Sequence, residues 1–312
     1  MSSVNNIRPT AASVLERLTL FANNNKRPLD TLVKQYMQER FLYKLSLLPS
    51  CQRKLVLQEY TLEEIKGAYL GDSSDRFFRN LNFVWQAGPS ARFIEEVKEV
   101  IKQICLCCDE RITHPTKYLS PVNWDINTLK LSYMKDNCPA VQVNITAYLA
   151  NCEQTLTFYI EPAWQKSDNT HKHYVLTKYR KHKLPVLDLL TVDSRVCFVS
   201  LWPELSVYPL EYVIANKYYA LFCMNAIRLK DVYDICFIQK HYELNISQVQ
   251  NAISEIFDRN WLVPKKNICK KLQTPLKKWE IFLRENKLKD VPVQVEEVCK
   301  LIEDVECSAI SQ

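Results

Sequence analysis

Residues 76–83 read Arg-Phe-Phe-Arg-Asn-Leu-Asn-Phe, and the interpretation of the whole chain depends on the two asparagines in this stretch, Asn80 and Asn82. Side chains alternate along a β-strand, so residues two apart point to the same face. Two carboxylates at this spacing could hold Mg²⁺, whereas asparagine keeps an oxygen ligand but carries no charge. The stretch therefore has the residue spacing of a metal-binding strand, but asparagines stand at the two positions where such a strand has carboxylates.

The first part of the chain is expected to form a sheet with helices packed on it. Runs rich in Val, Ile, Thr, Tyr and Phe indicate strands, and apolar residues three and four apart indicate helices. Ala150-Asn151 separates two such strands and predicts a hairpin. The expected elements are helices over residues 14–21, 29–45, 62–70 and 93–105, and strands over residues 54–60, 80–85, 140–149 and 154–160.

The second part changes to helical periodicity, with prolines between the periodic segments. Helices are expected over residues 210–223, 230–240, 247–258, 276–286 and 292–305. A mixed sheet followed by a helical bundle is an α+β (α/β) arrangement. We expect N-terminal helices over residues 1–50, a sheet-containing core over 51–205 and a C-terminal helical bundle over 206–312.

Composition excludes several functional classes. The chain has three glycines in 312 residues, and the phosphate-binding loops of kinases, P-loop enzymes and dinucleotide-binding proteins need clustered glycines. No run of about 18 apolar residues is present, so no membrane span is expected. The N-terminus is polar and lacks the pattern of a secretion signal. We therefore expect a cytoplasmic protein whose twelve cysteines are free thiols.

Several blocks of the sequence, taken together and in order, resemble one family. They are Leu55–Leu57 leading to Arg76–Asn82, Tyr208–Lys217, Arg228–Asp234, and the flanking segments Ala12–Val14, Glu39–Tyr43 and Trp279–Asn286. On these blocks the chain resembles the abortive-infection nucleotidyltransferase toxins of bacterial type IV toxin–antitoxin systems, the AbiEii class. The resemblance covers nearly the whole length. It implies a nucleotidyltransferase-like fold, Mg²⁺-dependent use of a nucleoside triphosphate, and transfer of a nucleotide to an acceptor such as tRNA.

Two charged positions of the family are retained. The resemblance places its basic residue of the bundle helix at Lys217, suited to phosphate charge, and its acidic residue at Asp231. It also makes Arg79, Lys217 and Lys230 candidates for nucleotide binding. A structural alternative is that Lys217 is a solvated helix residue and that Asp231 forms an ion pair with Arg228 or Lys230.

Three other features of the family are lost at one site. The paired carboxylates fall on Asn80 and Asn82, the glycine-containing turn after the first strand falls at about Glu59 and Tyr60, and a further carboxylate falls near Tyr159. Each missing interaction with a transferring phosphate costs roughly 10² to 10³ in rate. The resemblance therefore implies a degenerate metal site with little remaining catalysis, and natural decay or repurposing rather than a designed knock-out.

Three interpretations remain open from the sequence. The first is a nucleotidyltransferase-fold protein that acts by binding a nucleotide, an RNA or a protein partner, and holds no cofactor. The second is an active transferase that binds Mg²⁺ through substitute acids, with candidates Glu59, Asp72 and Asp75. The third is a pure protein-interaction module whose former cleft is filled by Phe77, Phe78 and Tyr159.

A basic segment over residues 171–183 is the best candidate for RNA contact, because it combines cationic side chains with aromatic ones and contains no acid. Its candidate RNA-binding residues are Lys172, Lys178, Arg180, Lys181 and Lys183. The alternative is a solvated surface loop, since the net charge of the chain is only +6.

The cysteine-rich stretch Cys105–Cys108 with His114 invites a zinc hypothesis. Structural zinc sites pair two ligand dyads, and no second dyad follows here. Buried thiols are therefore the favoured interpretation, and no metal ligand is assigned.

Overall fold

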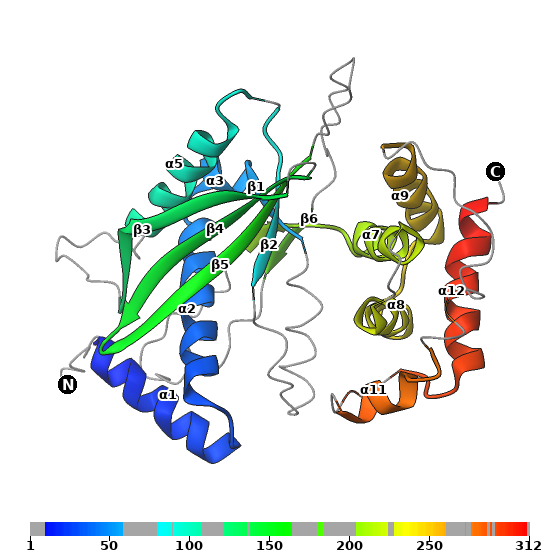
Figure 1. Ribbon diagram of the computed structural model, residues 1–312, viewed down its shortest axis with the longest axis horizontal. Coiled ribbons are helices and arrows are strands. Elements are labelled where there is room, and N and C mark those ends of the chain that lie inside the picture. The colour runs from blue at the N-terminus through cyan, green and yellow to red at the C-terminus, as the bar shows by residue number, and fades with distance from the viewer. Residues whose placement is uncertain are drawn as a thin grey trace, which may run out of the picture. The chain divides into compact units, whose positions relative to one another are not determined.

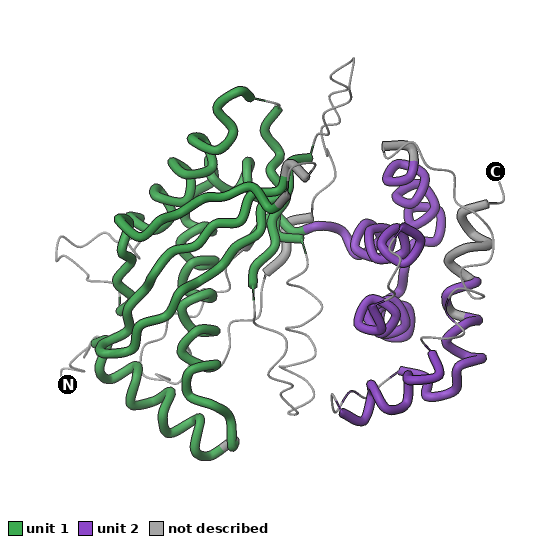
Figure 2. The backbone as a smooth tube through the Cα atoms, viewed as in Figure 1, with its two compact units in different colours: residues 1–207 green, residues 208–312 purple. Residues whose placement is uncertain are grey.

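The computed structural model describes residues 10–58, 80–88, 90–107, 121–135, 138–163, 180–183, 204–223, 228–259, 272, 276–285, 288 and 291–310. The chain divides into two compact units, residues 1–207 and 208–312 (Figure 2). Each unit is described by itself.

Unit 1 is built on a mixed sheet whose described strands number seven, in the order β3-β4-β5-β2-β1-β7-β6 (Figure 1). The β2–β5 and β1–β7 pairs are parallel and the other pairs are antiparallel. The strands are β1 Leu55–Leu57, β2 Leu81–Trp85, β3 Val122–Lys135, β4 Cys138–Leu149, β5 Cys152–Pro162, β6 Arg180–Lys183 and β7 Glu204–Val207.

The described helices of unit 1 share one core with one face of this sheet. They are α1 Ala11–Asn25, α2 Leu29–Ser46, α3 Pro49–Gln52 and α5 Phe93–Leu106. Alternation along β2 sends Leu81, Phe83 and Trp85 into the core, which leaves Asn82 on the other face. Phe41 of α2 anchors this core, since its ring stacks on Phe158 of β5 with centroids 4.4 Å apart. Large aromatic contacts of this kind fix α2 against the sheet.

The strands and helices expected in unit 1 are confirmed wherever the structure describes them. The hairpin β4–β5 turns at Ala150-Asn151 as predicted, with Ala150 at a φ of 52°. The helix expected over residues 62–70 lies outside the described residues. The sequence did not predict β3, because its register shifts between Asp125 and Lys130 and the period-two pattern is interrupted there. The short edge strands β6 and β7 were also missed.

A buried lysine caps the C-terminal end of α5. The ammonium of Lys44 donates to the backbone carbonyls of Cys105 at 3.0 Å and of Cys107 at 2.7 Å. Lys44 belongs to α2 and is 3% exposed. The last carbonyls of a helix lack intrahelical partners and carry partial negative charge, so a buried cation satisfies them well.

Lys44→Met is expected to destabilise the protein by about 2–3 kcal/mol, because the charge-assisted bonds to buried carbonyls are lost. Urea unfolding followed by circular dichroism measures the change. Lys102→Met is the matched control on α5, where Lys102 pairs with Glu99 at the surface, and it should cost less than about 1 kcal/mol. Equal losses in the two variants would show that Lys44 has no capping role.

Unit 2 is a helical bundle, as predicted. Its described helices are α7 Leu210–Cys223, α8 Leu229–His241, α9 Ile246–Arg259, α11 Trp279–Glu285 and α12 Val295–Ile310. α7 packs on α8 and α9, and α12 packs on the same two helices. The Phe257 ring of α9 contacts Tyr218, Tyr219 and Phe222 of α7. The predicted fold class, α+β (α/β) with a mixed sheet and a C-terminal bundle, is therefore confirmed.

Among the helices that the structure describes, none combines the length and the apolar character needed to cross a membrane.

Candidate functional site

The sheet of unit 1 brings together the positions at which the sequence predicts lost metal ligands. Asn82 of β2 is the register partner of Tyr159 on the adjacent parallel strand β5. Asn80 is exposed and comes immediately before β2. Asn82 and Tyr159 therefore lie together on the sheet face opposite the apolar core. The backbone of Asn82 is also held from β1, because its carbonyl accepts a hydrogen bond from Gln58 at 2.9 Å.

Uncharged polar side chains continue this face across the next strands. Gln142 of β4 is the register partner of Tyr159, and Asn144 is the register partner of Thr157. The Gln142 amide donates to Asn144 Oδ1 at 3.3 Å, and the Thr157 hydroxyl donates to the same oxygen at 2.8 Å. We call these five half-buried residues, Asn82, Gln142, Asn144, Thr157 and Tyr159, the amide face.

The amide face has no formal charge, which limits its chemistry. A divalent cation sheds its water only for strong oxygen ligands, and carboxylates supply most of that attraction. In the described part of the chain, no three His, Cys, Asp or Glu side chains are grouped so that they could hold a metal. The carboxylate that follows on the same side of β5 is Glu161, which is exposed. The face is thus suited to hydrogen bonding rather than to clamping Mg²⁺.

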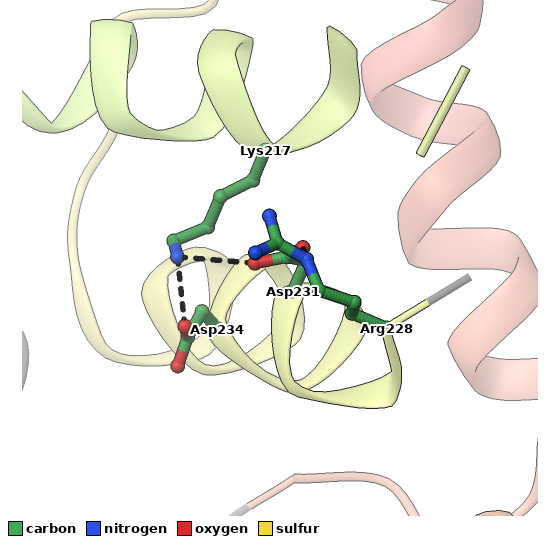
Figure 3. A network of polar contacts seen from close by, with 4 residues as sticks. All are labelled: Lys217, Arg228, Asp231 and Asp234. Carbon is green, nitrogen blue, oxygen red and sulfur yellow. Dashed lines mark hydrogen bonds and ion pairs between the residues drawn. The ribbon is translucent and has the colours of Figure 1, made fainter. Parts of the chain in front are cut away.

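Unit 2 contains a separate, charged network (Figure 3). The Lys217 ammonium of α7 lies 2.9 Å from an Asp234 carboxylate oxygen and 3.5 Å from Asp231, both on α8. The Arg228 Nε lies 2.7 Å from the other oxygen of Asp231, as an ion pair without hydrogen-bond geometry. The side chains of Lys217, Asp231 and Asp234 are buried, whereas that of Arg228 is 58% exposed.

This geometry follows from helix spacing. Asp231 and Asp234 are three residues apart and so share one face of α8, which α7 covers. Asp231 lies in the first turn of α8, where a negative charge complements the helix dipole. The alternative that Lys217 is a solvated residue is wrong, and the proposed Asp231–Arg228 ion pair is confirmed. Asp234 was missed by the sequence reasoning, although its spacing from Asp231 was a usable signal.

The arrangement of the network balances charge and links two helices. Two cations and two carboxylates cancel in formal charge, so burial is tolerated, and the shared ammonium ties α7 to α8. The roles of Lys217, Asp231 and Lys230 in nucleotide binding stay predictions. Lys230 is exposed at the start of α8.

Other predicted site residues are placed only in part. Arg180, Lys181 and Lys183 lie on β6, the edge strand that pairs with β7, rather than in a loop. Cys105 is buried, and this burial raises the pKa of its thiol to about 12. The remaining candidates lie outside the described residues: Glu59, Tyr60, Asp72, Asp75, Phe77, Phe78, Arg79, Cys108, His114, Lys172 and Lys178.

Comparisons with known proteins bear on the family. Two solved structures overlap most of the chain. JHP933 from Helicobacter pylori is 15% identical, with a TM-score of 0.44 over 89% of this chain and 91% of that chain. A candidate nucleotidyltransferase from H. pylori is 16% identical, with a TM-score of 0.39 over 89% and 92%. Both similarities are too low to assign a role to any individual residue. No curated protein matches the chain.

A family model gives the more specific result. Residues 187–292 match the family described as nucleotidyl transferase AbiEii toxin of type IV toxin–antitoxin systems. The matched region contains Lys217, Arg228, Asp231 and Asp234, the four residues of the charged network. This match covers about a third of the chain, and it agrees with the AbiEii resemblance that the sequence blocks predicted.

Proposed function

We propose that this AbiEii-family protein has lost metal-dependent nucleotide transfer and acts by binding. The observation that supports the proposal most strongly is the register of β2 and β5, which pairs Asn82 with Tyr159. Two positions expected to carry metal-binding carboxylates are therefore direct neighbours, and both are uncharged. A third, Asn80, comes immediately before β2 and is also uncharged.

The size of the expected loss supports inactivity rather than a slower enzyme. Each missing interaction with the transferring phosphate costs roughly 10² to 10³ in rate, so three losses at one site cost about 10⁶ or more. Lys217 does not offset this, because its charge is already balanced by two buried carboxylates. We expect the binding partner to be a nucleotide, an RNA or, as the toxin–antitoxin family suggests, a protein antitoxin, encountered in the cytoplasm.

The direct test is an assay of nucleotide transfer. We expect no incorporation when the protein is incubated with labelled nucleoside triphosphates, Mg²⁺ or Mn²⁺, and total RNA. An active AbiEii transferase run in parallel shows that the assay detects transfer. Robust incorporation by the purified protein would contradict the proposal and would favour an active enzyme using substitute acids such as Glu59, Asp72 or Asp75.

A restoration experiment tests whether residues 80 and 82 face a metal site. Asn80→Asp combined with Asn82→Asp returns carboxylates to the two positions at which the family resemblance expects them. Isothermal titration should then show tighter Mg²⁺ binding in the variant than in the wild type, because carboxylates attract the cation and amides do not. Equal Mg²⁺ affinity in the two proteins would mean that residues 80 and 82 do not face a metal site.

A pure interaction module remains the second candidate. It is favoured if nucleotides give no thermal shift and a stable protein partner is isolated with the full chain.

A further inference from the structure

The amide face lacks charged metal ligands, but its polar and aromatic side chains are arranged in a regular pattern. Its side chains come from three adjacent strands, β2, β5 and β4, so their spacing is set by the sheet. One row of register partners reads Asn82, Tyr159 and Gln142, and the next pairs Thr157 with Asn144. The structure thus holds an aromatic ring between two amides, with further hydrogen-bonding groups one row away.

We propose that the amide face binds a nucleobase without a metal ion, with the base stacked on Tyr159 and its edge hydrogen-bonded by the neighbouring amides. This inference rests on the proposed function, because it names the ligand chemistry of the same degenerate site. The base can belong to a free nucleotide or to a single-stranded RNA.

The absence of charge on the amide face favours a nucleobase over a phosphate or a cation as its ligand. A phosphate needs cationic donors and a divalent ion needs carboxylates, and neither type of group occurs among the five residues of the face. Asparagine and glutamine each offer both a carbonyl acceptor and an amino donor, which matches the mixed donor and acceptor edge of a base. A neutral, mixed array of this kind is a poor counterpart for either ion.

The amides are also held in position. Asn144 Oδ1 accepts from both Gln142 and Thr157, so the contacts orient its amino group as the remaining donor. Ordering these side chains before binding reduces the entropy lost when a ligand arrives. The Thr157 contact joins β5 to β4, whereas the Gln142 contact lies within β4.

The aromatic ring supplies the second element of base recognition. Sheet surfaces that bind single-stranded RNA use aromatic side chains on central strands as stacking platforms. Tyr159 is half-buried on β5, which has β4 on one side and β2 on the other. Lys130, exposed on β3, is the register partner of Asn144 and so lies two strands from β5, about 10 Å. A lysine at that distance can reach the phosphate of a nucleotide whose base lies on Tyr159.

The test uses the full chain in buffer containing EDTA. Isothermal titration with AMP, with a short single-stranded oligoadenylate and with ribose 5-phosphate compares a free base, a base within RNA and a ligand with no base. We expect binding of AMP or of the oligonucleotide but not of ribose 5-phosphate. Binding of AMP assigns the face to free nucleotides, and binding of the oligonucleotide alone assigns it to RNA; either supports the proposal.

Substitutions of single tyrosines test whether the ligand binds at the amide face. Tyr159→Ala should weaken binding about tenfold or more, whereas Tyr159→Phe should retain it, because stacking needs the ring and not the hydroxyl. Tyr133→Ala is the matched control. Tyr133 is an exposed tyrosine whose register partner, Val141, lies in the core, so it has the opposite side-chain parity, and its loss should not affect binding. Circular dichroism confirms that the variants are folded.

The outcomes separate this inference from the proposed loss of transfer. If neither base-containing ligand binds in EDTA, or if Tyr159→Ala binds like the wild type, the inference is wrong while the absence of transfer can still hold. If the protein transfers nucleotides in the presence of Mg²⁺, the proposed function is wrong even though EDTA-resistant base binding can remain.

Discussion

Lys217→Met is expected to lower the free energy of unfolding by about 3–5 kcal/mol, because it removes the cation shared by two buried carboxylates. Lys217 is 4% exposed, and Asp231 and Asp234 are 5% and 2% exposed, so water cannot replace the ammonium at low cost. Methionine keeps most of the side-chain volume, which isolates the loss of charge from a loss of packing.

Urea unfolding followed by circular dichroism measures this effect. Arg228→Ala is the matched control, because its side chain is 58% exposed and its ion pair with Asp231 should be worth less than about 1 kcal/mol. A double variant, Lys217→Met with Asp234→Leu, should lose less than the sum of the two single variants, since both remove the same ion pair. A cost below about 1 kcal/mol for Lys217→Met would show that the network does not hold α7 to α8.

Wild-type stability is expected to fall as the pH rises from about 4.5 to about 8, because of Glu39. Burial in α2 raises the pKa of this carboxyl to about 8, against the lowering effects of the Gln35 hydrogen bond and of Arg27 and Arg40. The folded state therefore binds a proton that the unfolded state releases above its ordinary pKa of 4.5. The stabilisation is complete below that value and is lost towards pH 8, at up to about 1.4 kcal/mol per pH unit.

Glu39→Gln should remove most of this slope. The variant keeps an oxygen that can accept from Gln35, which donates to Glu39 at 3.2 Å in the wild type. We expect the two proteins to be similar in stability near pH 4.5 and the variant to be several kcal/mol more stable near pH 8. Urea unfolding across this pH range checks the prediction, with the exposed Glu99→Gln as a control that keeps the wild-type slope. Parallel profiles for wild type and Glu39→Gln would contradict it.

Local sequence patterns predicted most of the described elements. The bundle helices agree within a few residues, since their apolar residues repeat with a helical period and prolines separate them. The hairpin was predicted from two runs rich in strand-forming residues around Ala150-Asn151. β3 was not, because the register shift between Asp125 and Lys130 interrupts the alternation on which such predictions depend.

The candidate sites were predicted less completely, for a related reason. Asn80, Asn82 and Tyr159 could be named from the family resemblance, as could Lys217 and Asp231. Gln142 and Asn144 could not, because each joins the amide face only through pairing with a neighbouring strand. Asp234 was missed although its spacing from Asp231 was a usable signal. The same limit applies to Lys44, whose burial depends on the end of α5.

The sequence by itself predicted most of the element types, the resemblance to the AbiEii family and the absence of charge at residues 80 and 82, because these follow from nearby residues or from ordered motifs. Only the tertiary structure decided that Asn82 lies beside Tyr159, that the amide face spans three strands, and that Lys217 is buried against two aspartates. Strand register and helix packing join residues far apart in the chain, and their choice depends on burial of the whole core rather than on any local pattern.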